Sequence, residues 1–290
     1  MKFAIFGNCH QLKKSQHAHH LFELLRQRQA EVYVDKEFYD FLRQTTLPDL
    51  SVAGVIDHKD FTADLVICLG GDGTFLRAAE KVGEKEIPIL GINTGRLGFL
   101  AAVAPEEMET ALDEIYRHEY SVEERITLEL RIDGNPLPEG SIALNEVAIL
   151  KRDSASMIGI HVDVNEKYIT TYQADGLIVA TPTGSTAYSL SNGGPIIVPQ
   201  LKAIALTAVA PHSLNTRPML IPDDGQLTIH VDSRSHNYLV AIDGRNYTCS
   251  DDVTLGIRRG GHCIRIIKRK NQDFFSTLRQ KLGWGTEQRL

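Results

Sequence analysis

Short apolar runs alternate with segments of helical periodicity over the first part of the chain. Leu65–Leu69 is continuously apolar, as in strands that are buried on both faces of a parallel sheet, and Ile87–Ile92 repeats the pattern. Gln16–Arg28 places leucines at helical spacing, and Pro105–Glu119 begins with proline and carries an apolar face. Strands that alternate with helices build parallel βαβ units, so we expect an α/β domain with a parallel sheet over residues 1–118.

A period of two replaces this pattern after Tyr120. In Ile126–Ile132 apolar and polar residues alternate, which is typical of a half-buried strand, and Asp133–Pro136 is a turn sequence. We expect a β-rich, antiparallel, sandwich-like domain over residues 119–272. Residues 273–290 begin with helical spacing again, and we expect this C-terminal helix to pack back on the first domain. Further strands are expected at Ile142–Leu150, Ile158–Val164, Leu177–Ala180, Leu227–Val231, Tyr238–Ile242, Val253–Ile257 and Cys263–Ile267.

The composition limits the classes of partner. The 290 residues are 42% hydrophobic and 23% charged, which is ordinary for a globular protein. The net charge of −6 argues against nucleic acid as a partner, because phosphate binding needs clustered positive charge. No apolar stretch approaches the roughly 18 residues of a membrane span, and the N-terminal apolar run is too short for a signal peptide. We expect a cytoplasmic protein that binds neither nucleic acid nor membranes.

Cysteine and histidine spacing predicts no metal site. The four cysteines are far apart and form no Cys-x-x-Cys pair. Three histidines lie between positions 17 and 20, but only His17 and His20 share a helix face, and no acidic residue lies at ligand spacing. We expect these histidines on a solvated helix surface.

The strongest chemical signal is the turn Gly70-Gly71-Asp72-Gly73-Thr74, which follows the apolar run ending at Leu69. Glycines permit positive φ and let backbone N–H groups approach an anion without a Cβ in the way. We expect Thr74 to cap a helix over Phe75–Val82, whose positive end then points into the turn. The sequence fits neither the Walker loop nor Gly-x-Gly-x-x-Gly. We predict a phosphate-binding turn.

Asp72 indicates that this turn takes part in a reaction. A carboxylate repels phosphate, and it makes sense here if it accepts the proton of a hydroxyl that attacks the phosphate. The alternative is that Gly-Asp-Gly is only a tight turn. Arg77, one helical turn further on, is either a phosphate contact or an ordinary exposed residue.

Two later segments favour a nucleotide ligand. The block 181–191 is rich in hydroxyls and small residues, which allow close approach to a planar ring, and Tyr188 can stack on one. Asn145 and Glu146 are polar residues in an otherwise apolar run, and a ribose diol would satisfy this amide and carboxylate. The alternatives are a surface loop for the block and an exposed strand face for the pair.

In combination, these motifs resemble the bacterial NAD kinases. The matching segments, in order, are Gly70–Thr74, Asn93–Leu100, Asn145–Glu146, Asp175–Gly176, Thr181–Tyr188 and Leu282–Trp284. The resemblance implies an enzyme that transfers a phosphoryl group from ATP, or polyphosphate in some members, to the adenosine 2′-hydroxyl of NAD. It also implies a divalent metal cation, Mg²⁺ brought with the donor, and a homo-oligomer, either a dimer or a tetramer.

The resemblance also implies roles for individual residues. Asp72 matches the proton acceptor, and Gly73 lies beside it in the donor loop, with Arg77 as a phosphate contact. Asn145 and Glu146 match the pair that holds ribose hydroxyls. The remaining nucleotide-binding residues that it implies are Asp175 near the nicotinamide end, Thr186, Ala187, Tyr188, Ser189, Leu190 and Ser191 on the adenine side, and Ala210 as a backbone contact.

Two positions depart from the family pattern, and two alternatives remain. Gln173 stands where some members carry Arg, and an amide cannot neutralise phosphate as guanidinium does, which leaves the preference between NAD and NADH open. Arg245 stands where many members carry Gln, which puts a contact there in doubt. Diacylglycerol kinases share the Gly-Gly-Asp-Gly turn, so a lipid kinase is the first alternative. The second is a dinucleotide sensor without chemistry, which would have no need of Asp72.

Overall fold

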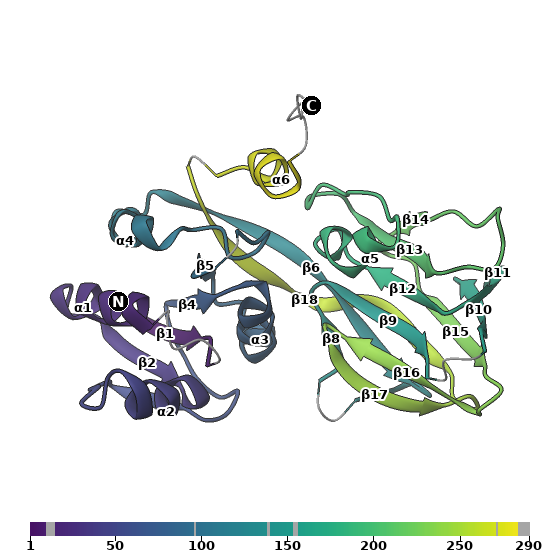
Figure 1. Ribbon diagram of the computed structural model, residues 1–290, viewed down its shortest axis with the longest axis horizontal. Coiled ribbons are helices and arrows are strands. Elements are labelled where there is room, and N and C mark those ends of the chain that lie inside the picture. The colour runs from purple at the N-terminus through teal and green to yellow at the C-terminus, as the bar shows by residue number, and fades with distance from the viewer. Residues whose placement is uncertain (10–14, 96, 138–139, 153–155, 271, 284–290) are drawn as a thin grey trace, which may run out of the picture. The chain divides into compact units, whose positions relative to one another are not determined.

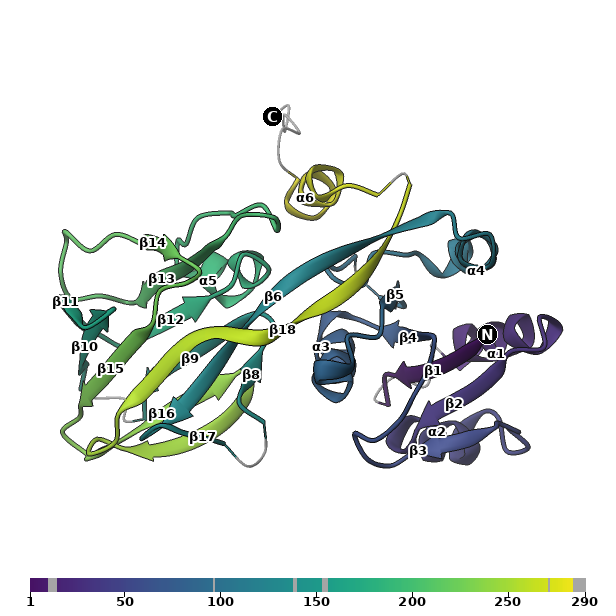
Figure 2. The same ribbon diagram turned by 180° about the vertical axis from the view of Figure 1, so that it is seen from behind.

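The computed structural model describes residues 1–9, 15–95, 97–137, 140–152, 156–270 and 272–283 (Figure 1 and, from behind, Figure 2). The chain divides into unit 1, residues 1–124 with 264–290, and unit 2, residues 125–263. The sequence pattern placed the boundaries at 118/119 and 272/273. They differ because β6 (Tyr120–Ile132) and β18 (Leu255–Arg269) each contribute residues to both units, so the boundaries fall inside strands.

Unit 1 contains the predicted parallel sheet with helices. Its strands run in the order β3-β2-β1-β4-β5, and all neighbours in this series are parallel. Every residue of β4 is buried, which explains its continuous apolar run. The bounds are β1 Lys2–Gly7, α1 Ser15–Gln27, β2 Glu31–Asp35, α2 Lys36–Thr45, β3 Gly54–Ile56, β4 Leu65–Gly70, α3 Asp72–Val82, β5 Ile89–Asn93, α4 Met108–Tyr116 and α6 Phe274–Leu282.

Unit 2 contains two antiparallel sheets, as predicted. One sheet has the order β14-β13-β12-β9-β16-β17, and the other includes β11-β10-β15-β18, with β6 beside β18. The buried core draws on both sheets, with Val147 and Leu177 from one and Ile160 and Ile229 from the other. The bounds are β7 Asn135–Pro136, β8 Ile142–Ala143, β9 Glu146–Lys151, β10 Ile158–Val164, β11 Lys167–Ala174, β12 Gly176–Ala180, α5 Tyr188–Ser191, β13 Ala203–Val209, β14 Met219–Pro222, β15 Leu227–Asp232, β16 Asn237–Ile242 and β17 Arg245–Ser250.

Three strand predictions were wrong in their boundaries. The expected strand Ile142–Leu150 is split into β8 and β9, because the backbone N–H groups of 144–146 bond to a side chain instead of a neighbouring strand. The expected strands Val253–Ile257 and Cys263–Ile267 form the single strand β18. A Cβ at Gly260 would lie 2.3 Å from Thr127 Oγ1 on β6, so glycine allows the two strands to approach closely.

Within the part of the chain that the structure describes, no helix is both long and apolar enough to cross a membrane.

Candidate active site

The glycine turn connects β4 to α3, but its local geometry differs from the prediction. The helix begins at Asp72, with Gly71 as N-cap, so Thr74 lies in the first turn and is not the cap. The glycines of this turn do not have positive φ. Gly70 is required for a steric reason, since a Cβ there would lie 2.4 Å from Thr74 Oγ1. Beside Gly71 and Gly73 an added Cβ would meet nothing within 4 Å, so their backbone is open to a ligand.

Asp72 is held by the loop that follows β5. Its Oδ2 accepts the N–H of Phe99 at 3.0 Å, and its Oδ1 accepts those of Leu100 and Ala101, each at 3.1 Å. A Cβ at Gly98 would lie 2.0 Å from Oδ1, so only glycine fits there. The loop from Asn93 to Ala101 therefore forms a seat for the carboxylate, a role that the sequence did not reveal. Its residue 96 lies outside the described residues.

Asn93 fixes the course of this loop. It is buried, its Nδ2 donates to the Ala101 carbonyl at 3.1 Å, and its Oδ1 accepts the N–H of Gly95 at 2.6 Å. Both ends of the seat are thus tied to the last residue of β5.

Arg77 lies on α3 with its guanidinium directed to the carboxyl end of β1. It donates to the Gly7 carbonyl at 2.9 Å and to Glu37 at 3.0 Å, and its side chain is 46% exposed. It is therefore more than a solvated helix residue, because it links three elements at the sheet edge where the glycine turn lies.

In unit 2, Asp243 organises the Asn145–Glu146 pair. Its carboxylate accepts the N–H groups of Leu144, Asn145 and Glu146 at 2.7, 2.9 and 3.1 Å. Asp243 has φ +46°, so a turn in the left-handed region aims this side chain. Burial raises the pKa of Asp243, while the three N–H bonds act in the opposite direction. Sequence reasoning missed this residue, for which the Asp-Gly dipeptide was the one available signal.

Glu146 is the most perturbed carboxylate of this region. Burial, followed by the nearby charge of Asp243, raises the pKa of Glu146 to about 8. The backbone N–H of Tyr188 donates to the same carboxylate. The buried Oε2 atom has no hydrogen-bond partner among the described residues. The structure thus brings Glu146 and Tyr188 together and leaves Oε2 for a hydrogen bond to a further polar group.

The hydroxyl-rich block packs against this pair. A Cβ at Gly184 would lie 2.1 Å from the Asn145 carbonyl oxygen, and Thr181 Oγ1 donates to the Leu144 carbonyl at 2.6 Å. The Ser189 hydroxyl is buried and bonds to Thr207 Oγ1 at 2.9 Å, so it is engaged within the protein.

The remaining residues of the block differ in exposure. The side chain of Thr186 donates to the Thr183 carbonyl at 3.2 Å, whereas Tyr188 is 38% exposed. Ala187 and Leu190 are half-buried, and Ser191 is exposed. Tyr188 is thus the large side chain of the block that a ligand can reach.

Asp175, Gln173 and Ala210 lie close together. The Asp175 carboxylate pairs with Lys151 at 2.7 Å, and its N–H donates to the Val209 carbonyl at 2.9 Å. Ala210 follows directly and has φ +44°, a strained value for a residue with a Cβ. The Gln173 carbonyl accepts the N–H of His212 at 2.9 Å.

Arg245 binds backbone in this structure. It donates to the carbonyls of Ile142 at 2.8 Å and Ile242 at 3.3 Å. The guanidinium that departs from the family pattern thus ties β8 to the end of β16.

Family models match both units. The ATP-NAD kinase N-terminal domain matches residues 3–120, and the ATP-NAD kinase C-terminal domain matches residues 144–269. A NAD kinase of Bacteroides fragilis (strain ATCC 25285) is 58% identical over all 290 residues, covering 100% of both chains. The chain belongs to the NAD kinase family. A NAD kinase of Porphyromonas gingivalis (strain W83) is 44% identical over 284 residues, covering 98% of each chain.

Solved NAD kinase structures share the fold. A NAD kinase from Archaeoglobus fulgidus in complex with ATP has a TM-score of 0.77 at 26% identity and covers 98% of this chain and 99% of its own. Yeast NADH kinase complexed with NADH has a TM-score of 0.88 at 23% identity and covers 100% of this chain and 89% of its own.

Membership of the NAD kinase family confirms the resemblance found in the sequence. The chain is an enzyme, a kinase that phosphorylates NAD, and these matches do not support the lipid kinase alternative. NAD kinase chemistry generally uses a divalent metal. Of the closing motif Leu282–Trp284, the tryptophan lies outside the described residues.

Proposed function

We propose that this chain transfers the γ-phosphoryl group of ATP to the 2′-hydroxyl of the adenosine ribose of NAD, with Asp72 as the proton acceptor. The observation that carries the proposal is the seat of Asp72. Three backbone N–H groups fix its carboxylate at the first residue of α3, beside two glycines whose backbone is open. A carboxylate with no chemical task would only weaken phosphate binding at this position.

The reaction balances with Asp72 as the base. The 2′-oxygen attacks the γ-phosphorus, the bond from that phosphorus to the β,γ-bridging oxygen breaks, and ADP leaves with the electron pair. Asp72 takes the hydroxyl proton. Its Oδ1 already accepts two N–H groups and its Oδ2 accepts one, so Oδ2 is the oxygen with room for the proton. Phosphoryl transfer depends mainly on positioning and charge neutralisation, and a fixed carboxylate meets the first need.

The open glycines suit the donor phosphates. The backbone of Gly71 and Gly73 leaves space for an anion at the positive end of α3, and Arg77 lies one turn further along that helix. The Asp72 oxygens already accept hydrogen bonds from three N–H groups, so we assign the divalent cation to the donor phosphates. We propose that this cation is Mg²⁺. When bound, it supplies neutralisation of phosphate charge.

Unit 2 supplies the groups that we assign to NAD. Asn145 and Glu146 would bind ribose hydroxyls, and the unpartnered Glu146 Oε2 supports this assignment, because a buried polar atom needs a partner. The exposed Tyr188 ring would stack on a base. We also propose, as the family resemblance implies, that the nucleotide-binding residues include Asp175, Thr186, Ala187, Ser189, Leu190, Ser191 and Ala210.

A single substitution tests the base. Asp72→Asn removes the proton acceptor, and we expect NADP formation from NAD, ATP and Mg²⁺ to fall at least about 100-fold, with NAD affinity unchanged within a few-fold. The matched control is Asp57→Asn, a half-exposed carboxylate of unit 1 paired with Lys36 at 2.9 Å, which should keep full activity. Turnover near wild type in Asp72→Asn would reject the assignment.

Gly98→Ala gives a second, independent test. The variant keeps the Asp72 carboxylate, but the added Cβ would occupy the space of its Oδ1 atom and displace the carboxylate from the three N–H groups. We therefore expect turnover to fall although the carboxylate is still present. Gly261→Ala is its control, since an added Cβ there meets nothing within 4 Å.

Two further properties remain predictions, namely assembly into a homo-oligomer, either a dimer or a tetramer, and a cytoplasmic location. The phosphoryl donor is ATP in our proposal, and polyphosphate is the alternative that the sequence leaves open. Light scattering on the purified chain tests the assembly, and assays with each donor decide between ATP and polyphosphate.

A further inference from the structure

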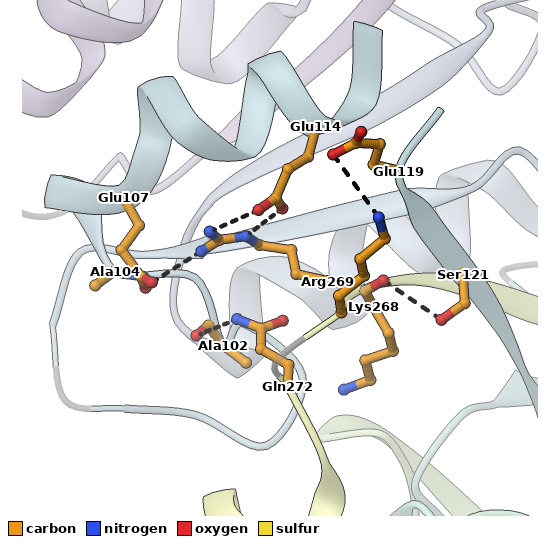
Figure 3. Close-up of polar contacts among 10 residues, drawn as sticks. Ala102, Ala104, Glu107, Glu114, Glu119, Ser121, Lys268, Arg269 and Gln272 are labelled. Atoms are coloured by element: carbon orange, nitrogen blue, oxygen red, sulfur yellow. Dashed lines mark hydrogen bonds and ion pairs between the residues drawn. The ribbon is translucent and has the colours of Figure 1, made fainter. Parts of the chain in front are cut away.

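The segment that leads into α6 is anchored to the rest of unit 1 (Figure 3). Arg269, at the end of β18, donates to Glu114 at 2.6 and 3.1 Å and to Glu107 at 2.8 Å. Gln272 Nε2 donates to the Ala102 carbonyl at 3.1 Å, directly after the loop that seats Asp72. The start of α6 is thus fixed against α4 and against the end of that loop.

The helix itself is defined at both ends. The Asp273 side chain caps it by accepting the N–H of Ser276 at 2.9 Å, and Gly283 ends it with φ +63°. Leu278 is its buried residue. The Phe274 ring lies 6.3 Å from the Phe99 ring, so α6 packs on the residue whose N–H binds Asp72.

Lys281, in the last turn of α6, reaches this carboxylate. Its Nζ lies 3.7 Å from Asp72 Oδ2 and 5.0 Å from the centre of the Phe99 ring. The Lys281 and Asp72 side chains are 33% and 30% exposed. The ammonium group therefore faces Oδ2, which is the oxygen that we assign as the proton acceptor. The other oxygen, Oδ1, already accepts two backbone N–H groups.

We propose that Lys281 is a positioning residue for phosphoryl transfer, which holds Asp72 Oδ2 ready for the sugar hydroxyl and offsets the carboxylate charge beside the donor phosphates. The inference rests on the proposed function of Asp72. A lone carboxylate would repel the triphosphate, whereas a carboxylate paired with an ammonium group adds no net charge to the turn. The C-terminal helix is thereby part of the catalytic machinery of unit 1, although it follows the phosphate turn by about 200 residues in sequence.

The ion pair between Lys281 and Asp72 is partly exposed, so a contribution to folding stability does not explain its presence. Pairs of partly exposed charged groups contribute little to folding, so a purely structural Lys281 would be replaceable at no cost to turnover. We expect Lys281→Met to lower kcat at least tenfold and to raise the KM for ATP, with the KM for NAD within about twofold and the thermal midpoint unchanged within a few degrees. Lys281→Arg, which keeps the charge, should recover most of the loss.

Arg279→Met is the matched control. Arg279 is an exposed cation in the same last turn of α6, so the variant removes the same charge from the same helix, and it should keep wild-type kinetics. Equal losses in Arg279→Met and Lys281→Met would show a general charge effect and overturn the proposal. Should Lys281→Met be poorly folded, Lys281→Gln with its thermal midpoint gives the same comparison.

A double-mutant cycle shows whether Lys281 acts through Asp72. In an Asp72→Asn background, Lys281→Met should cause no further loss of the residual rate, because the group that it positions has gone. An undiminished further loss would mean that Lys281 acts directly on substrate, which overturns the positioning role. Wild-type turnover in Lys281→Met with a strong loss in Asp72→Asn would reject this inference alone, whereas activity in Asp72→Asn would reject the proposed base itself.

Discussion

Two carboxylates of the proposed machinery, Asp72 and Glu146, lie in different surroundings. Asp72 is 30% exposed and accepts three backbone N–H bonds. Glu146 is half-buried with its Oε2 atom buried, accepts the N–H of Tyr188 and lies near the charge of Asp243. The backbone holds Asp72 open to a ligand, while burial disfavours the charged form of Glu146. Asp72 therefore suits proton abstraction, and Glu146 suits binding of a hydroxyl.

The raised pKa of Glu146 predicts a pH dependence of stability. The ordinary value of 4.5 is raised to about 8 in the folded protein, so the folded state binds this proton more tightly than the unfolded chain does. The resulting contribution to the free energy of unfolding is complete below pH about 4.5 and is lost as the pH rises through about 8. In Glu146→Gln we expect the decline in stability over this range to shrink by on the order of 3 kcal/mol, as measured by urea unfolding at several pH values.

Glu109→Gln is the control for this experiment, because Glu109 is an exposed glutamate on α4. It should leave the pH dependence as in the wild type. A Glu146→Gln variant whose stability falls with pH as steeply as the wild type would show that Glu146 titrates normally.

Some residues of the site could be predicted from the sequence, and others could not. Asp72 and Glu146 were predictable because each is a charged residue in a glycine turn or an apolar run. Gly98 and Asp243 were not, because their tasks arise from partners far away in the chain. Asp72 bonds to N–H groups 27 to 29 positions away, and Asp243 to groups 97 to 99 positions away.

At the scale of elements, the anchor of β18 on α4 is a partly buried ion pair. The Arg269 side chain is 12% exposed and that of Glu114 is 22% exposed, and the hydrogen bond from Arg269 holds the pKa of Glu114 below its usual range. We expect Arg269→Ala to lower the free energy of unfolding by about 2–3 kcal/mol at pH 7, since it leaves two glutamates without this partner. The loss should diminish as the pH falls through the lowered pKa of Glu114, because the carboxyl is then protonated in both variants.

Lys270→Ala controls for the loss of a neighbouring charge. Lys270 is 70% exposed and lies 3.9 Å from Glu119, so its removal should cost no more than about 0.5 kcal/mol. Similar losses in both variants, measured by denaturant unfolding, would contradict the special role of Arg269.

Elements with one dominant pattern were predictable, and those shaped by contacts were not. The apolar run of β4 and the amphipathic α1 gave clear signals. β11, β13 and β17 escaped prediction from the pattern, and α3 starts three residues before its expected start because Gly71 is its N-cap. The continuity of β18 was hidden by Arg258–His262, a polar and glycine-rich stretch that stays in the strand because Gly260 packs on Thr127 of β6.

For the whole molecule, the two-domain division followed from the change of hydrophobic period, but its boundaries did not. The change of hydrophobic period marks where the secondary structure changes, whereas the boundary of a unit depends on which residues pack together. Here the two boundaries of unit 2 fall inside the long strands β6 and β18. The chain also carries a net charge of −6 while its proposed substrates, NAD and ATP, are anions. The overall field therefore does not attract them, and binding depends on local neutralisation.

From this charge balance we expect turnover to depend on a cation that arrives with the donor. EDTA should lower NADP formation at least about 100-fold, and excess Mg²⁺ should restore it. Because we assign this cation to the donor phosphates and not to the protein, EDTA should leave the thermal midpoint of the nucleotide-free protein unchanged within about 1 °C. Within the described residues no group of three or more His, Cys, Asp or Glu side chains could hold a metal ion. A midpoint several degrees lower in EDTA would reveal a resident ion in the protein, and turnover that survives EDTA would show that cations on the protein, such as Lys281 and Arg77, suffice to neutralise the donor.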